Sequence, residues 1–230
     1  MPCTVALLAH TPHPDELVAA AARICYRDVT AADLLAGERE SLSEALLDQL
    51  WRSGHLSTFE HASFTFAVDG LSRVASHQLV RHRMASFSQQ SQRYVRMTDS
   101  AVIVPSSVAD MPEAEALFRQ QAEASFAAYR RLIELGVPAE DARFILPHGW
   151  ETRLVLTMNA RELHHFFHLR LCRRAQWEIR ALARQMLVLC RQEAPVLFKR
   201  AGPSCIFGAC GEVKPCGRPF KDMEDLLVED

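Results

Sequence analysis

The order in which strand-like and helix-like segments follow one another constrains the fold most. Ser63–Val68 alternates in character with a period of two, which places Phe64, Phe66 and Val68 on one face of a strand. Val5–Ala9 is a short continuous apolar run of the kind found in buried strands. Segments with helical spacing of apolar residues lie between these and later strand-like segments. The sequence therefore predicts an α/β chain of the α+β type, in which helices and strands intermix.

Capping and turn signals give approximate bounds to the other elements. Ser41-Leu42-Ser43-Glu44 and Asn159-Ala160-Arg161-Glu162 are capping-box patterns, and Asp110 to Glu113 resembles one. Asp69-Gly70 has the turn chemistry that would close the strand before it. We expect helices near 15–25, 42–53, 71–83, 111–135, 160–170 and 175–193, a short helix carrying Arg143, and strands near 93–97, 102–104 and 152–158. The apolar faces expected for the two longest helices are Leu117, Gln121, Ala124, Ala128 and Leu132 in one, and Ile179, Leu182, Met186 and Cys190 in the other.

Composition narrows the classes of protein that the chain can represent. Its 230 residues, 49% hydrophobic and 23% charged, suit one main domain over 1–200, followed by a tail over 201–230 with three cysteines and an acidic end. The net charge of -2 argues against a general affinity for nucleic acid or acidic membranes. We expect no membrane span, because no apolar run approaches about 18 residues. Seven cysteines and no signal-peptide pattern indicate a cytoplasmic protein with reduced thiols.

The stretch over residues 76–94 is the strongest candidate for a ligand site. It combines Arg81, His82, Arg83 and Arg93 with many serines and glutamines, and it contains little apolar filling. Arginine forks match phosphate and carboxylate, while Ser and Gln can hydrogen-bond to a base or ring edge. The chain has neither a dinucleotide-binding glycine pattern nor a P-loop, so arginines must hold any phosphate. The candidates are Arg81, Arg83, Arg93, Arg143, Arg161 and Arg170.

Three other patterns have a functional and a structural interpretation. His164 and His168 have metal-ligand spacing, but histidines on a polar helix face or satisfied by hydrogen bonds are the favoured interpretation. The tail cysteines Cys205, Cys210 and Cys216 lack tight Cys-x-x-Cys spacing, so reduced thiols are favoured over a zinc site. Ser91 has no evident base beside it, which favours a hydroxyl contact to the ligand over covalent catalysis. We therefore expect no metal site.

An RNA-binding module is one rival to an enzyme. In that reading, the arginines between Arg81 and Arg93 form a basic patch, and Phe87 and Tyr94 stack on bases. The net charge and the lack of an RNA-binding motif make this reading the weaker one.

Several blocks of the sequence resemble the flavin-dependent thymidylate synthases. Their signature corresponds here to Arg81-His82-Arg83, then Ser91 and Arg93. Further blocks follow in the order and at the spacing of the family, over about residues 1–200. These blocks are Gly54 to His61 with the Phe-Thr-Phe strand after it, Ala142-Arg143 before Leu146-Pro147, Asn159-Ala160-Arg161, Leu169-Arg170 and Ala175 to Ile179.

The resemblance implies an activity and an architecture. It implies that dTMP is made from dUMP, with carbon from methylenetetrahydrofolate and reducing equivalents from NADPH through FAD. It also implies a homotetramer with shared active sites, in which helices pack on a mainly antiparallel sheet. The residues that it implies for flavin binding are Ser57, Glu60, Arg81, His82, Arg83, Gln89, Asn159, Arg161 and His165. Those that it implies for dUMP are Gln78, Arg81, Gln89, Gln90, Ser91, Gln92, Arg93, Arg143 and Arg170.

Two details bear on the chemistry that the resemblance implies. The family often has Asn-Glu where this chain has Ser88-Gln89, and a Gln can hydrogen-bond but cannot carry charge or act as a base. Arg170 is the expected catalytic residue, because an arginine that stays protonated can stabilise negative charge developing on a uracil ring.

The second rival to the thymidylate synthase interpretation is a different flavoprotein oxidoreductase that acts on a phosphorylated substrate.

Overall fold

The computed structural model describes residues 3–28, 30, 32–33, 44–99 and 101–228. Its strands are β1 (Thr4–His10), β2 (Ser63–Ser72), β3 (Ala85–Gln89) and β4 (Glu151–Asn159). Its α-helices are α1 (Pro14–Arg23), α3 (Glu44–Ser53), α4 (Arg73–Leu79), α5 (Ser106–Ala109), α6 (Pro112–Glu134), α7 (Ala139–Ala142), α8 (Ala160–Arg170), α9 (Trp177–Glu193) and α10 (Met223–Val228). Short 3-10 turns are η1 (Leu56–His61), η2 (Arg143–Ile145) and η3 (Ser204–Ile206).

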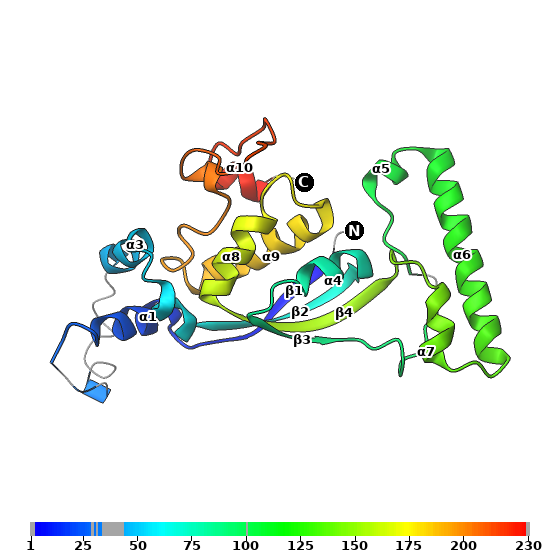
Figure 1. Ribbon diagram of the computed structural model, residues 1–230, viewed down its shortest axis with the longest axis horizontal. Helices are drawn as coiled ribbons and strands as arrows, with labels where there is room; N and C mark the ends of the chain where they lie inside the picture. Colours follow the sequence, from blue (N-terminus) through cyan, green and yellow to red (C-terminus); the bar gives the residue numbers. More distant parts are fainter. Residues whose placement is uncertain (1–2, 29, 31, 34–43, 100, 229–230) are drawn as a thin grey trace.

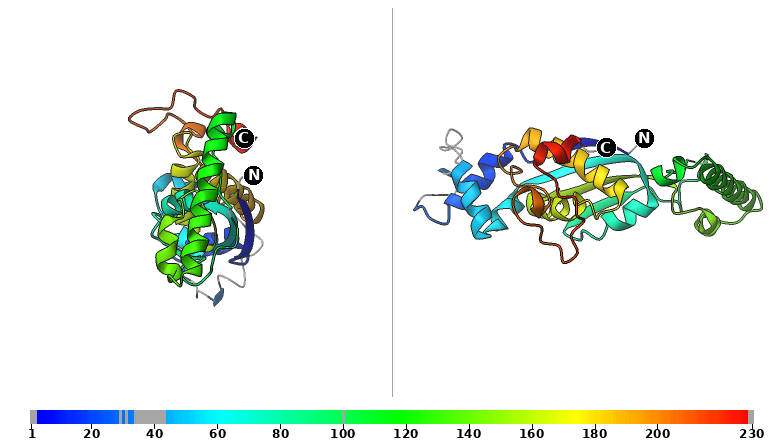
Figure 2. Two further views of the ribbon diagram at one scale, coloured as in Figure 1. Left: turned by 90° about the vertical axis from the view of Figure 1, so that its right-hand side faces the viewer. Right: turned by 90° about the horizontal axis from the view of Figure 1, so that it is seen from above.

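The four strands form one antiparallel sheet in the order β1-β2-β4-β3. Alternation along β2 and β4 turns Phe64, Phe66 and Val68, together with Leu154 and Leu156, toward the main core, where all are buried. Helices α4, α8 and α9 lie on that side of the sheet, as the side and top views show (Figure 1, Figure 2). The expected fold class, helices packed on an antiparallel sheet, is confirmed.

Helix α6 lies beyond one end of the sheet and has a small core of its own (Figure 1). It buries Ala122, Phe126 and Tyr129, and the two aromatic residues pack with Trp150, just before β4, and with neighbouring residues of this second cluster. The predicted apolar face was wrong for four of its five residues: Leu117 is 67% exposed, and Gln121, Ala124 and Ala128 are exposed as well, while Leu132 packs against this cluster as expected. The large aromatic side chains bury the most apolar area, so they determine which face of α6 packs inward.

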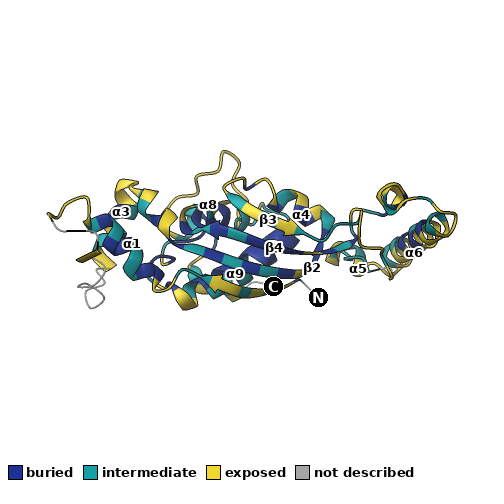
Figure 3. Ribbon diagram, turned by 90° about the horizontal axis from the view of Figure 1, so that it is seen from below, coloured by how far each residue is buried: buried dark blue, intermediate teal, exposed yellow. Residues whose placement is uncertain are grey.

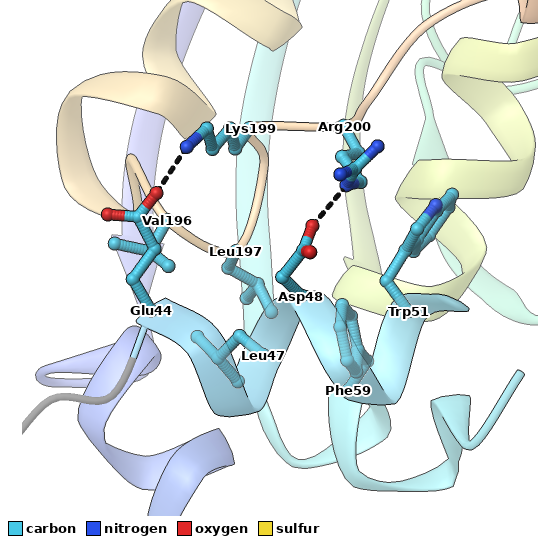
Figure 4. A pocket seen from close by; sticks show the side chains of 9 residues that line it. All are labelled: Glu44, Leu47, Asp48, Trp51, Phe59, Val196, Leu197, Lys199 and Arg200. Carbon is cyan, nitrogen blue, oxygen red and sulfur yellow. Dashed lines mark hydrogen bonds and ion pairs between the residues drawn. The ribbon is translucent and has the colours of Figure 1, made fainter. Parts of the chain in front are cut away.

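Helix α3 is anchored to the segment that follows α9, around a small cavity (Figure 4). Lys199 pairs with Glu44, and Nε of Arg200 donates to Oδ1 of Asp48 at 2.5 Å. These pairs hold Trp51, near the end of α3, beside the cavity wall. The predicted capping residues Ser41 to Ser43 lie outside the described residues.

The predicted turn at Asp69-Gly70 was wrong, because β2 continues through it to Ser72. The pairing of β2 with β4 shifts register between Val68 and Leu71, and Gly70 has a φ of 75°. A glycine in this conformation lets a strand take up an extra residue as a bulge without ending. The next helix therefore starts later than 71, and it ends at Leu79 rather than near 83.

The stretch over 76–94 contains a strand that the sequence did not reveal. β3 pairs with β4 at the sheet edge, with Phe87 half-buried and its neighbours Ser86 and Ser88 exposed. The predicted strand over 93–97 was wrong, since the backbone turns there and Val95 N donates to Ser91 O at 2.9 Å. The predicted strand over 102–104 is reduced to a single bridge from Val102 to Trp150.

Other predictions were confirmed. Strands β1 and β4 occur where expected, and α9 buries Ile179, Leu182, Met186 and Cys190. Asn159 caps α8, because its Oδ1 accepts a hydrogen bond from the backbone N–H of Glu162 at 2.9 Å. The expected cap at Asp110 was wrong: Met111 occupies the N-cap position of α6 and makes no side-chain cap bond.

The last part of the chain packs against the main core. Phe220 and Leu226 are buried there, and α10 contacts α9. The division between residues 1–200 and 201–230 stays a prediction. None of the helices in the described segments is both long enough and apolar enough to span a membrane.

Candidate active site

His82 is the centre of a buried hydrogen-bonded chain that joins the turn after α4 to both ends of α8. Its Nδ1 lies 3.1 Å from Oε1 of Glu162, and its Nε2 lies 3.0 Å from Nε of Arg170. An arginine Nε–H can only donate, so Nε2 of His82 must accept and Nδ1 must carry the proton given to Glu162. Arg170 also donates from Nη2 to the carbonyl oxygen of Gln78 at 3.3 Å. The guanidinium is thereby held in one orientation.

Burial and neighbouring charge keep this imidazole neutral. Only 3% of His82 is exposed, and burial, followed by the positive charges of Arg170 and His165, lowers its pKa to about 4. Burial also lowers the pKa of Arg170, although a guanidinium stays protonated at neutral pH. Burial raises the pKa of the Glu162 carboxyl. The result is a fixed cation whose position depends on a neutral histidine and a carboxyl group.

Beside this chain lies a cavity of about 600 Å³, which is large enough for a sizeable ligand. It is lined by Trp51, Leu56, Glu60, Met84, Asn159, Arg161, Glu162, His164, His165, His168 and Gly202. Nη1 of Arg161 donates to Oε1 of Glu60 at 2.5 Å, which links α8 to η1. Nδ1 of His164, in this lining, and Oγ1 of Thr58, in the neighbouring η1, are among the buried polar atoms that have no hydrogen-bond partner in the described structure. Buried polar atoms are normally paired, so Nδ1 of His164 suits a site whose ligand completes it.

The structure brings together some of the residues expected to bind flavin. Glu60, Asn159, Arg161 and His165 line the cavity of about 600 Å³, and His82 is hydrogen-bonded to its lining residue Glu162. The remaining expected residues are Ser57, Arg81 and Arg83, which are exposed and lie outside this lining, and Gln89. Nε2 of Gln89 donates to Oγ of Ser76 and to Oγ1 of Thr152, both at 3.1 Å.

The loop after β3 carries the serine and arginine of the signature. Oγ of Ser91 accepts a hydrogen bond from the backbone N–H of Arg93 at 3.2 Å, which holds this turn closed. Nε of Arg93 donates to Oε2 of Glu140 at 2.9 Å, so the loop is tied to α7. The neighbouring Gln90 forms a backbone bond to Arg153 of β4.

A second cavity, of about 280 Å³, contains two further residues expected to bind dUMP, Gln92 and Arg143. Three polar residues that the sequence did not single out, Arg73, His77 and His148, also line it. Gln78 and Arg170 contact each other elsewhere, beside His82. The expected dUMP residues are therefore spread over neighbouring segments in one chain.

Sequence reasoning missed Glu162 and His164 as members of the site. The only pattern that included Glu162 was the capping box of α8. Its contact with His82 joins positions 80 residues apart, so no short segment of the sequence contains both residues. His164 was weighed as a metal ligand. It is buried, its Nε2 donates to the carbonyl oxygen of Leu197 at 2.9 Å, and burial lowers its pKa to about 4.

The remaining sequence patterns concern a possible metal site and the cysteines of the tail. Across the described residues, no three side chains among His, Cys, Asp and Glu gather as a metal site. Cys205 is half-buried, Cys210 and Cys216 are exposed, and all three are free thiols. Sγ of Cys216 contacts the backbone N and O of Arg218 at 3.4 Å. The expectation of plain reduced thiols in the tail stays a prediction.

Comparison with known proteins gives one consistent result. The family model described as thymidylate synthase complementing protein matches residues 6–196. A flavin-dependent thymidylate synthase of Geobacter sulfurreducens is 53% identical, over 95% of this chain and 98% of the relative. Another, of Nitratidesulfovibrio vulgaris, is 49% identical, over 93% of this chain and 94% of the relative.

A solved structure is similar as well. It is a UMP/dUMP methylase, PolB of Streptomyces cacaoi, bound with 5-Br dUMP. The TM-score is 0.76 at 29% identity, and the match covers 86% of this chain and 93% of that one. The family match, the identities and this shared fold agree, and the chain belongs to the flavin-dependent thymidylate synthases.

Proposed function

We propose that this enzyme converts dUMP to dTMP, taking the carbon from methylenetetrahydrofolate and reducing equivalents from NADPH through FAD. Relatives at 53% and 49% identity that carry the family activity in their names support this, as does the similar methylase that binds a dUMP analogue. The observation that carries the proposal is the Glu162–His82–Arg170 chain, which lies beside the cavity of about 600 Å³.

FAD fits the chemistry of that cavity. Its walls combine the aromatic ring of Trp51, apolar Leu56 and Met84, and polar groups of Asn159 and Arg161. This mixture suits a molecule with a flat ring system and a polar, anionic part. The unpaired buried Nδ1 of His164 is available to complete a hydrogen bond there. When bound, FAD supplies the redox chemistry that the side chains of a protein lack.

Arg170 has the properties needed to activate the pyrimidine. Its Nε–H is held by His82 and one Nη2–H by Gln78, and its other N–H groups have no hydrogen-bond partner among the described residues. A fixed cation of this kind stabilises negative charge that develops on a carbonyl oxygen or on N3 of uracil. Because His82 is neutral, its Nε2 can accept a hydrogen bond from Arg170, and the ring places no second positive charge beside the guanidinium. We propose that Arg170 acts on dUMP in this way, with His82 and Glu162 positioning it.

The loop after β3 and the neighbouring segments would hold the rest of dUMP. Ser91 and Arg93 lie on one exposed turn, Gln92 and Arg143 line the second cavity, and these groups offer hydroxyl, amide and guanidinium donors. The amide nitrogen of Gln89 already donates to Ser76 and Thr152, so we propose that Gln89 positions the loop and does not bind the ligand directly. As an amide it neither carries charge nor acts as a base.

We further propose a homotetramer, and one face of the sheet supports the existence of an interface. The face opposite the helices carries Ala6, Ala67, Val155 and Ser88 side by side across the four strands. Figure 1 shows α4, α8 and α9 on the other side of the sheet, and Figure 3 shows this face from below. Small and apolar side chains on a sheet face suit packing against a second protein surface.

We also propose a cytoplasmic location, on the grounds that all seven cysteines are free thiols.

An omission assay tests the proposed function. Purified protein is incubated with dUMP, methylenetetrahydrofolate, FAD and NADPH, and dTMP is measured by chromatography. We expect dTMP with the full set and none when dUMP or the folate is left out. NADPH oxidation without dTMP would contradict the proposal and favour a different flavoprotein oxidoreductase, while a protein that binds no flavin would contradict both.

A further inference from the structure

The tail of the chain, described over residues 201–228, contacts the loop that follows Arg170. This loop runs from Leu171 to Gln176 and joins α8 to α9. The tail is drawn in orange and red beside the two helices (Figure 1), and its helix α10 contacts α9. The family model matches residues 6–196, so the tail lies outside the match. Its contacts with the loop nevertheless lie next to the expected catalytic residue.

Arg173 is the more buried of two arginines that join the loop to the tail. Its guanidinium carbon lies 4.2 Å from the ring centroid of Phe220, and its Nη2 lies 3.7 Å from Oδ2 of Asp225 in α10. The side chain of Arg173 is 16% exposed, and Phe220 is 3% exposed. Nη1 of Arg180, on α9, also donates to the carbonyl oxygen of Arg173 at 3.2 Å. Because a cation–π contact strengthens when it is shielded from water, this contact should hold the loop firmly.

Arg174 makes a second set of contacts with the tail. Its Nη1 donates to Oε2 of Glu212 at 2.8 Å and to the carbonyl oxygen of Lys214 at 2.7 Å. Residues 207–219 are all exposed, so polar contacts of this kind, rather than buried apolar side chains, hold that part of the tail. The pair of Arg174 with Glu212 is itself 45% and 42% exposed, and an exposed pair contributes little. Arg173 is therefore the stronger link.

The position of Arg170 makes it sensitive to this loop. Arg170 is the last residue of α8, and the final turn of a helix frays more readily than its middle. The turn is closed by the backbone N–H of Leu171, which donates to the carbonyl oxygen of Phe167 at 3.1 Å. Opening of this turn would move the backbone of Arg170 and disturb the bonds of its guanidinium to His82 and Gln78.

We propose that Arg173 is a positioning residue for catalysis. Held by Phe220 and Asp225 of the tail, it keeps the last turn of α8 closed and so keeps Arg170 in place. The inference rests on the proposed function, because it takes Arg170 as the group that activates the pyrimidine. Arg173 acts through the backbone of the loop. A misplacement of about 1 Å can slow an enzyme about a hundredfold, so a small opening of this turn is enough to lower the rate.

The test uses the full-length enzyme and two variants that remove the same contact from opposite sides. Arg173→Gln removes the cation, and Phe220→Leu removes the aromatic face but keeps an apolar side chain. Arg218→Gln is the matched control, because Arg218 is an exposed residue of the tail whose only hydrogen bonds within the described structure join its backbone to Cys216. Circular dichroism and flavin absorbance show whether each variant is folded.

Steady-state kinetics distinguish positioning from a general structural effect. We expect Arg173→Gln and Phe220→Leu to lower kcat for dTMP formation about tenfold or more, while the KM for dUMP and the flavin content stay within twofold of wild type. Arg218→Gln should keep the wild-type kcat. In enzyme that already carries Arg170→Ala, Arg173→Gln should cause no further loss, because no guanidinium remains to be positioned. A further loss by the same factor in that background would overturn the proposal.

Hydrogen–deuterium exchange tests the same inference without relying on activity. The amides of residues 169–172 should exchange about three- to thirtyfold faster in the two variants than in wild type, in line with the strength of one cation–π contact. Those at the start of α8 should not change, and Arg218→Gln should match wild type throughout. Wild-type enzyme that forms no dTMP would contradict the proposed function, and the exchange would still test Arg173. Unchanged exchange of these amides in the folded variants would overturn the inference.

Discussion

At the scale of residues, His82 links the stability of the protein to the geometry of its site. It is buried as a neutral imidazole that accepts from Arg170 and donates to Glu162. Protonation of His82 would place a second cation against Arg170 and remove the acceptor that orients it. The same side chain should therefore matter to folding at low pH and to catalysis near neutrality.

We predict that the enzyme loses stability as the pH falls from about 6.5 to 4. The pKa of His82 and of His164 is about 4 in the folded protein, while unfolded histidine has a pKa of about 6.5, so below 6.5 the unfolded chain takes up protons first. The difference of 6.5 − 4 = 2.5 units corresponds to at most about 3 kcal/mol per histidine. Urea unfolding at several pH values measures the loss.

A variant isolates the contribution of His82 from that of other groups. Asp15 and Glu162, whose pKa burial raises, act in the opposite sense as the pH falls. In His82→Gln the fall in unfolding free energy between pH 6.5 and 4 should be smaller than in wild type. Equal slopes in the two proteins would show that His82 is not protonated on unfolding.

A site residue can be predicted from the sequence when its contacts lie close along the chain, and not when they lie far apart. The signature residues, the capping role of Asn159 and the arginine count are visible in short segments. The contact of His82 with Glu162 and the cavity that combines Arg73 with Arg143 join residues that lie 80 and 70 positions apart. The first contact depends on how β3 pairs with β4, and the second depends on how β2 pairs with β4; no local pattern encodes either pairing.

At the scale of elements, the position of α4 depends on a buried carboxylate. Oε1 of Glu178, near the start of α9, accepts from the backbone N–H of Ser72 at 2.6 Å, and Oε2 accepts from Oγ of Ser72 at 2.5 Å. Oγ of Ser72 in turn accepts from the backbone N–H of Ala75 and so caps α4. The helix that carries Arg73 and Gln78 is thereby fixed to α9 at its first turn.

We predict that Glu178→Gln lowers the free energy of unfolding by about 1.5 to 3 kcal/mol, the usual worth of a hydrogen bond to a charged group. Glu178 is 2% exposed, so water cannot replace the lost bond. Glu193→Gln at the other end of α9 is the control, because its pair with His10 is partly exposed and should contribute less than about 1 kcal/mol. Equal losses in the two variants, measured by urea unfolding, would contradict the anchoring role.

Elements with strong local signals were predictable, and those that depend on neighbours were not. α9 and β4 show clear periodicity and occur where expected. β3 has only a half-buried Phe87 between exposed serines and forms because β4 offers a free edge beside it. The buried face of α6 depends on contacts with Trp150, which the pattern within the helix does not contain.

At the scale of the whole molecule, the face of the sheet opposite the helices is a surface suited to assembly. Val155 is 39% exposed at its centre, between Ala67 on β2 and Ser88 on β3. Its cross-strand neighbours Ala67 and Ser88 are small, so a partner surface can approach the backbone closely there. An interface there would bring two sheets together face to face.

We predict that Val155→Asp lowers the oligomeric state of the enzyme. A buried, unpaired carboxylate is costly at an interface, so sedimentation equilibrium should show a smaller mass than the four 25.9 kDa chains expected for wild type. Val213→Asp in the tail, where Val213 is 97% exposed, is the control and should keep the wild-type mass. A Val155→Asp enzyme of unchanged mass would show that this face lies outside the interface.

We propose that Arg170, held by His82, activates dUMP for methylation at carbon 5. The most direct test is the release of tritium from dUMP labelled at that carbon, with FAD, NADPH and methylenetetrahydrofolate present. We predict that wild-type enzyme releases tritium in step with dTMP formation. Arg170→Ala should keep its flavin but release tritium about a hundred- to a thousandfold more slowly. Near-normal release by Arg170→Ala, or dTMP-independent NADPH oxidation without release by wild type, would contradict the account.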